Sequence, residues 1–138
     1  MIDETIARIE KLQTHSSSVV AVEAALALRE LSDREYPTVD EFLVSLEQNS
    51  DALRRANPSH ASLRQTQRRI VDEVTAADYG SVADATERML AVIDTVVAEI
   101  ESSKDRIADR AASLLADGET LLTHGYSSTV AETLDTAI

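Results

Sequence analysis

The sequence contains no cysteine and no tryptophan, and its 138 residues include only three Gly, two Pro, three Tyr and one Phe. Without cysteine, the chain has no disulfide, no thiolate metal site and no thiol nucleophile. Because aromatic side chains are so few, the core must be built from Ala, Val, Leu and Ile. The scarcity of Gly and Pro favours long helices over a β fold with many turns. Apolar residues make up 43% of the chain, which is enough for one compact domain.

Lysine is nearly absent, since only Lys11 and Lys104 among the 13 basic residues are lysines, against 25 acidic residues. The net charge of -12 argues against nucleic acid and against an anionic membrane surface as partners. Abundant acid with little lysine is typical of proteins from salt-loving cells, where molar salt screens the repulsion between surface charges. We therefore expect a halophilic protein, and an acidic protein from an ordinary environment is the alternative.

Long apolar runs are also missing. No stretch approaches the roughly 20 apolar residues that span a bilayer. The N-terminus, MIDETIARIEKL, is charged and amphipathic, which is unlike a signal peptide. We expect a cytoplasmic protein with no membrane partner.

The first half of the chain has the apolar spacing of helices. Ile2, Ile6, Ile9 and Leu12 form one helical stripe. The segment from Val19 to Leu31 is apolar on nearly all sides, which predicts a helix buried in the middle of a bundle. A capping box at Thr38 and Glu41 then begins another helix. That helix ends before Pro58, because a residue that precedes proline avoids the α region.

The second half predicts a shorter helix and then a long one. The pattern from His60 to Ala77 has Leu63, Ile70 and Val74 on one side. Ser81 with Asp84 resembles a helix cap, and the helical period then continues without a break from Val82 to Ala116. We expect Asp117-Gly118 to close this helix as a left-handed cap. The predicted fold is mostly all-α, with four shorter helices packed on one long spine helix.

The stretch from Gly118 to Leu134, GETLLTHGYSSTVAETL, has a different pattern. Residues Thr120 to His124 have β character, residues 125–128 are a small polar turn, and Val130, Leu134 and Ile138 recur at helical spacing. A strand, a turn and a helix are the first step of a βαβ unit. We therefore expect a helical domain at residues 1–117, followed at residues 118–138 by the start of a truncated α/β domain.

Two runs of the chain carry a family resemblance. Residues 104–108, KDRIA, and residues 114–130, LLADGETLLTHGYSSTV, resemble the alpha/beta/delta regulatory subunits of translation initiation factor 2B, and the alpha type in particular. The segments 16–22 and 54–70 fit the N-terminal helical domain of that family more weakly. The resemblance implies a Rossmann-like second domain, most of which would lie beyond Ile138. It also implies either of two activities, because the family contains both regulatory subunits and sugar-phosphate isomerases.

Three departures favour the regulatory branch over the isomerases. The isomerases carry a catalytic cysteine after the Thr-His of the strand, and this chain has Gly125, which supplies neither a thiolate nor an acid or base. Their phosphate-binding Arg-Gly corresponds here to residues 14–17, Thr-His-Ser-Ser, and their Arg-Pro-Thr to residues 57–59, Asn-Pro-Ser. We expect no enzymatic activity, no catalytic residue and no cofactor from this chain. The alternative is the N-terminal domain of an isomerase of the ribose-1,5-bisphosphate type, inactive in this chain.

The candidate ligand-binding residues lie mostly in the turn before the last helix: they are His124, Gly125, Tyr126, Ser127, Ser128 and, in an earlier helix, Arg55. Tyr126-Ser127-Ser128 suits a phosphate at a helix N-terminus, and simple capping by Ser127 or Ser128 is the alternative. The arginines Arg54, Arg55, Arg64, Arg68 and Arg69 form either an anion-binding face or, as we favour, a solvated surface. The three histidines, His15, His60 and His124, lack the spacing of metal ligands, so we expect no metal.

The partner that we expect is a second copy of the chain, most simply in a dimer, and the resemblance adds other translation initiation factor subunits. The apolar side chains of residues 118–138 need a cover, and an open strand edge is a template for pairing. The alternative is that this tail folds back on its own bundle as a coil or a short helix.

Overall fold

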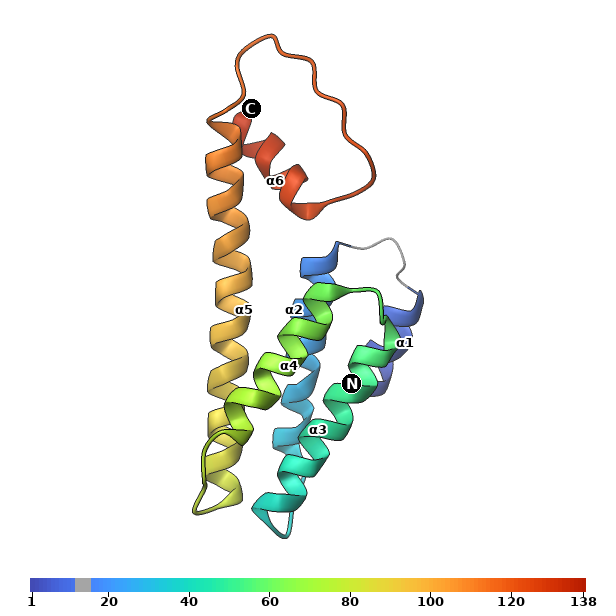
Figure 1. The fold of residues 1–138 in the computed structure, drawn as a ribbon, viewed down its shortest axis with the longest axis vertical. Coiled ribbons are helices and arrows are strands. Elements are labelled where there is room, and N and C mark those ends of the chain that lie inside the picture. The colour runs from blue at the N-terminus through green and yellow to red at the C-terminus, as the bar shows by residue number, and fades with distance from the viewer. Residues whose placement is uncertain (12–15) are drawn as a thin grey trace.

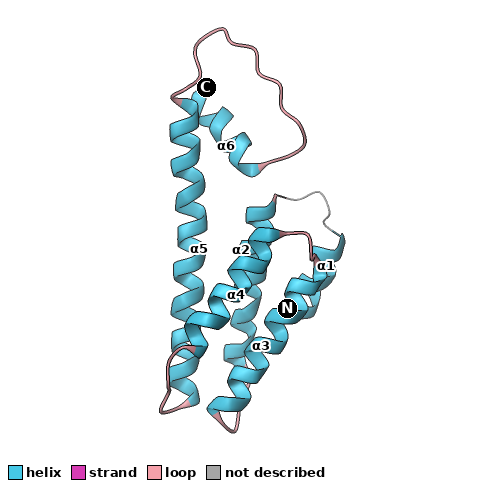
Figure 2. Ribbon diagram, in the orientation of Figure 1, coloured by secondary structure: helices cyan, strands magenta, loops and turns pink. Residues whose placement is uncertain are grey.

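The computed structural model describes residues 1–11 and 16–138, and all regular elements within these ranges are helices (Figures 1 and 2). In chain order they are α1 (Ile2–Lys11), α2 (Ser17–Ala27), the 3-10 helix η1 (Leu28–Asp33), α3 (Val39–Ala56), α4 (Ala61–Thr75), α5 (Val82–Ala112) and α6 (Ser128–Ala137). The prediction of a mostly all-α chain is confirmed. None of these helices is both long and apolar enough to cross a membrane.

The buried centre of the bundle is α2, as its all-round apolar pattern predicts. It packs against α1, α4, α5 and η1. Ala24 and Ala25 are completely buried, and these small side chains allow neighbouring helices to approach closely. The helix tightens into η1 at Leu28, which is itself buried together with Leu31. The predicted buried segment is therefore confirmed, although it consists of two kinds of helix.

Three helices begin with the side-chain caps that the sequence predicts. The Thr38 hydroxyl accepts a hydrogen bond from the Glu41 N–H at 3.2 Å, at the start of α3. Ser81 accepts from the Asp84 N–H at the start of α5, and Ser127 accepts from the Val130 N–H at the start of α6. Each cap satisfies one of the N–H groups that a helix leaves without a partner in its first turn.

The spine helix α5 has 31 residues, so it is about 46 Å long. Its N-terminal half buries Met89, Ile93 and Val96 in the core, whereas its C-terminal half extends beyond the bundle (Figure 1). The helix ends at Ala112, and not at Ala116 as predicted. The reason is a tightening of its last turn, since the Leu114 and Leu115 N–H groups bond to carbonyls three residues earlier. Gly118 has the predicted left-handed φ of 83°, but it lies in the loop beyond that turn.

The predicted strand from Thr120 to His124 is wrong. These residues are exposed and have no regular structure, and the described part of the chain contains no strand with which they could pair. An extended segment without a neighbouring strand leaves its N–H and C=O groups to water. The helix predicted after the turn is confirmed as α6. It folds back and packs against the C-terminal half of α5, so the tail contacts its own bundle (Figure 1).

Candidate functional site

The N-termini of α2 and α6 meet in space, although they are far apart in the chain. The hydroxyls of Ser16 and Ser128 share a hydrogen bond of 2.7 Å, and those of Ser18 and Ser128 share one of 3.0 Å. A third bond of 3.1 Å joins Ser16 to Ser18. We call these three residues the serine cluster (Ser16, Ser18, Ser128).

Local structure explains why these hydroxyls face one another. Ser127 caps α6, so the Ser128 hydroxyl is free to point towards α2. Ser16 precedes α2, and its side chain makes no capping bond to that helix. Both helices direct their first N–H groups and the positive ends of their dipoles towards this region. Two converging helix N-termini with hydroxyl donors suit an anion such as a phosphate.

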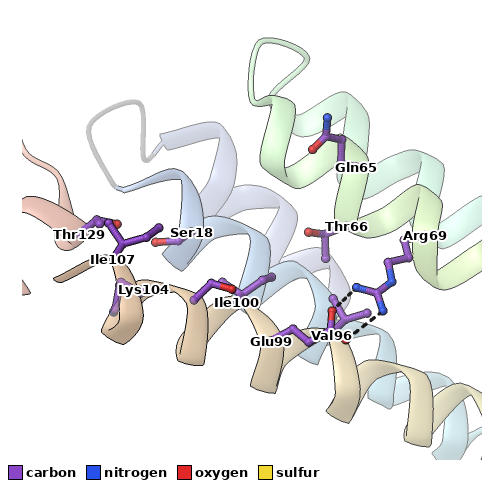
Figure 3. A pocket seen from close by; sticks show the side chains of 11 residues that line it. Ser18, Gln65, Thr66, Arg69, Val96, Glu99, Ile100, Lys104, Ile107 and Thr129 are labelled. Carbon is purple, nitrogen blue, oxygen red and sulfur yellow. Dashed lines mark hydrogen bonds and ion pairs between the residues drawn. The ribbon is translucent and has the colours of Figure 1, made fainter. Parts of the chain in front are cut away.

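A cleft of about 380 Å³ lies beside the serine cluster, between α2, α4, α5 and α6 (Figure 3). Ser18, Thr129, Lys104 and Ile107 line one end of it. Lys104 forms no ion pair with any residue that the structure describes. The cleft therefore combines hydroxyl groups with one cation that has no carboxylate partner.

The other cation of the cleft, Arg69, is held by acids. Its guanidinium donates to the Glu73 carboxylate at 2.7 Å. It also forms a two-point contact with Glu99, which Figure 3 shows. The Glu99 carboxylate, followed by that of Glu73, raises the pKa of Arg69. These contacts fix α4 to α5 and leave the Arg69 charge compensated. Lys104 is thus the cation that a ligand in this cleft could pair with.

The residues proposed from the sequence divide into two groups. Ser128 belongs to the serine cluster, and Ser127 caps α6 beside it. His124, Gly125 and Tyr126 lie in the exposed loop before α6 and do not line the cleft. Gly125 has a φ of 72°, a left-handed conformation that favours glycine.

Arg55 lies apart from the cleft, near the end of α3. Its side chain is 80% exposed and faces Asp51 at 3.6 Å. Of the other positions that the resemblance singled out, Thr14 and His15 lie outside the described residues. Asn57 ends α3 and does not line the cleft. Within the described ranges, no three His, Asp or Glu side chains gather as metal ligands would.

Sequence reasoning missed the partners that complete the site, namely Ser16, Ser18, Lys104 and Thr129. A signal for the first two was present, because a run of serines begins the buried helix α2. Their contact with Ser128 spans 112 residues of chain, and no local pattern encodes such a distance. Lys104 also had a signal, as one of only two lysines in a very acidic chain.

The fold and the cleft define a helical domain with a ligand-sized site at one end of its bundle. The chain belongs to the initiation factor 2 subunit family (IF-2B), whose model matches residues 13–138. The family resemblance drawn from the sequence is confirmed.

Known relatives include an enzyme and translation factors. The chain is 26% identical over 138 residues to the ribose 1,5-bisphosphate isomerase of Thermococcus kodakarensis, a match that covers 97% of this chain and 42% of the isomerase. The fold of this chain is similar to that of the translation initiation factor eIF-2B subunit delta of A. fulgidus, with a TM-score of 0.77 and 21% identity. The match covers 99% of this chain and 42% of that one.

A second solved structure of the same fold is the tetrameric eIF2B-beta2-delta2 complex of C. thermophilum. It matches with a TM-score of 0.81 and 24% identity over 99% of this chain and 45% of the other. The chain therefore spans less than half the length of each of these three relatives.

Proposed function

We propose that this chain is the N-terminal helical domain of an initiation factor 2B-like regulatory subunit and that it acts by binding other protein chains. The distribution of exposed apolar side chains along the chain supports this proposal. Apart from Met1 and Val44, all large exposed apolar side chains of the described residues lie between Ile107 and Ile138. We call this set the apolar segment: Ile107, Leu114, Leu121, Leu122, Tyr126, Val130 and Ile138.

The apolar segment has the properties of an interaction surface. Leu122 is 98% exposed and Leu114 is 79% exposed, and α6 buries none of its residues fully against α5. Soluble monomers rarely leave several large apolar side chains together in water. In our proposal, residues 1–117 are the helical domain and residues 118–138 begin a second unit that presents most of this surface.

The occupant that we propose for this surface is a second copy of the chain, related by a two-fold axis. A two-fold contact lets one patch cover the same patch on its partner, so a single exposed surface is sufficient. The C. thermophilum relative supports assembly as the mode of action, because it was solved as a beta2-delta2 tetramer. Other initiation factor subunits would bind through the same surface. A role in translation initiation implies a cytoplasmic location.

The cleft beside the serine cluster gives this module a place to sense a nucleotide or a sugar phosphate. Hydroxyl donors, two helix N-termini and Lys104 would hold the phosphate group. Because Ser16 and Ser18 belong to the bundle and Ser128 to the tail, a phosphate bound there would join the two. Ligand binding would thus stabilise the position of the surface that binds the partner.

The alternative is the N-terminal domain of a sugar-phosphate isomerase, which the similarity to the Thermococcus kodakarensis enzyme favours. Gly125 argues against activity of this chain, because it offers no group for proton transfer or nucleophilic attack. The purified chain should bind ribose 1,5-bisphosphate without converting it. Turnover above a buffer control would refute the regulatory assignment.

Sedimentation equilibrium over a range of concentrations tests assembly. The unmodified chain should show a mass above that of its 15.0 kDa monomer, rising with concentration. The double variant Leu122→Ser, Tyr126→Ser should stay monomeric, because both side chains point into solvent and their loss leaves the fold intact. Val44→Ser on α3 is the matched control, since Val44 is also an exposed apolar residue but lies elsewhere. A monomer at every concentration would overturn the proposal.

A further inference from the structure

A second hollow lies between α3 and α4 and is lined mainly by arginines. Its volume is about 230 Å³, and its lining residues are Arg54, Ala61, Arg64, Gln65 and Arg68. Three guanidinium groups thus surround one small space, and no carboxylate of residues 1–11 or 16–138 lines it. We call it the arginine hollow (Arg54, Arg64, Arg68).

This concentration of positive charge is unusual for the chain. The sequence carries 25 acidic residues against 13 basic ones, and most arginines pair with an acid. Arg64 and Arg68 form no ion pair with any described residue. They lie four residues apart on α4, where like charges repel and destabilise the helix. Both are exposed, so neither is needed for packing.

Arg54 adds a third cation from the facing helix. It pairs with Asp51 on its own helix, but Asp51 lies outside the lining of the arginine hollow. The Nε atom of Arg54 is buried and has no hydrogen-bond partner within the described residues. A buried donor without an acceptor is unfavourable, and Arg54 is the residue of the hollow that carries one.

We propose that the arginine hollow binds a phosphate group, either free or on a small phosphorylated molecule. A guanidinium presents its donors as a planar fork that matches the oxygens of a phosphate, and several such groups accommodate a dianion. The hollow is too small for a polymer, and the net charge of -12 opposes the approach of nucleic acid. A compact anion of high charge fits these conditions.

The arginine hollow is separate from the cleft beside the serine cluster. Gln65 borders both, but the cations differ, because Arg69 and Lys104 line the cleft whereas Arg54, Arg64 and Arg68 line the hollow. The arginine hollow is therefore a separate candidate site, and it does not depend on the ligand proposed for the cleft.

A nuclear magnetic resonance titration of the arginine side-chain N–H groups tests the inference. Inorganic phosphate and glycerol 2-phosphate are added in separate arms, and sodium acetate at equal ionic strength is the control anion. We expect saturable shifts at Arg54, Arg64 and Arg68 with both phosphates and none with acetate. Tighter binding of the ester would identify a phosphorylated molecule as the ligand, and equal or tighter binding of inorganic phosphate would identify the free ion.

Variants then locate the site. Arg64→Gln with Arg68→Gln should weaken binding by about tenfold or more, since each lost guanidinium removes charge-assisted hydrogen bonds. Arg106→Gln with Arg110→Gln is the matched control, because these arginines are also exposed, also four apart and also border a hollow, but one that contains Asp109. It should leave binding at the arginine hollow unchanged. No saturable shift, or an equal loss in a control variant, would overturn the inference.

Discussion

Gln67 is a polar side chain enclosed in the apolar core, and its replacement by methionine should stabilise the protein. The residue is completely buried on α4, and neither its amide oxygen nor its amide nitrogen has a hydrogen-bond partner within the described residues. Burying an unpaired polar group costs about 1–3 kcal/mol. Methionine is unbranched and of similar volume, so Gln67→Met removes this cost without forcing the neighbours to move.

The expected gain in the free energy of unfolding is therefore about 1–3 kcal/mol, which raises Tm by roughly 3 °C for each kcal/mol in a domain of this size. Chemical and thermal denaturation followed by circular dichroism would measure both. Gln65→Met is the matched control, because Gln65 is exposed on the same helix and its replacement should change stability by less than about 0.5 kcal/mol. A Gln67→Met variant less stable than the unmodified chain would show that the amide is satisfied in solution.

Three further predictions concern the stability of the bundle. Arg34, the Ile2 N–H and the N-terminal ammonium together lower the pKa of Glu30 from its ordinary 4.5 to about 2. Glu30→Gln should therefore destabilise the protein by about 1 kcal/mol at neutral pH, and denaturation at several pH values should show this difference vanish as pH falls from 4.5 through 2. Ala24→Leu should cost about 1–3 kcal/mol by overpacking the centre of the bundle, whereas Ala7→Leu on the exposed side of α1 should cost little in the same denaturation assay. If the protein is halophilic, Tm should rise between low and molar KCl, where the Debye length falls to about 3 Å, and an unchanged Tm would contradict that reading.

The helices could be predicted from the sequence because their signals are local. The spacing of Leu63, Ile70 and Val74 defines the buried face of α4, and all three are buried. The caps at Thr38 and Ser81 each depend on residues three positions apart. Local signals of this kind are read from a few neighbouring residues, so they do not require knowledge of the tertiary fold.

The strand at Thr120–His124 and most of the candidate site could not be predicted, because both depend on distant parts of the chain. A segment of β character becomes a strand only beside another strand, and the described residues offer none. The contact between Ser16 and Ser128 depends on how α6 folds back against α5. The family resemblance drew attention to Gly125 and Tyr126, but the groups that gather beside the cleft are Ser18 and Lys104.

Hydrogen–deuterium exchange at low and high protein concentration tests most directly the claim that the apolar segment binds another chain. The amides of residues 120–126 lie in an exposed loop and should exchange fast in the dilute protein. At high concentration, protection should appear in this loop and in α6, and it should be absent from the Leu122→Ser, Tyr126→Ser variant. The bundle helix α3 should show no concentration dependence. Protection that is confined to α3, or exchange that is the same at every concentration, would contradict the account.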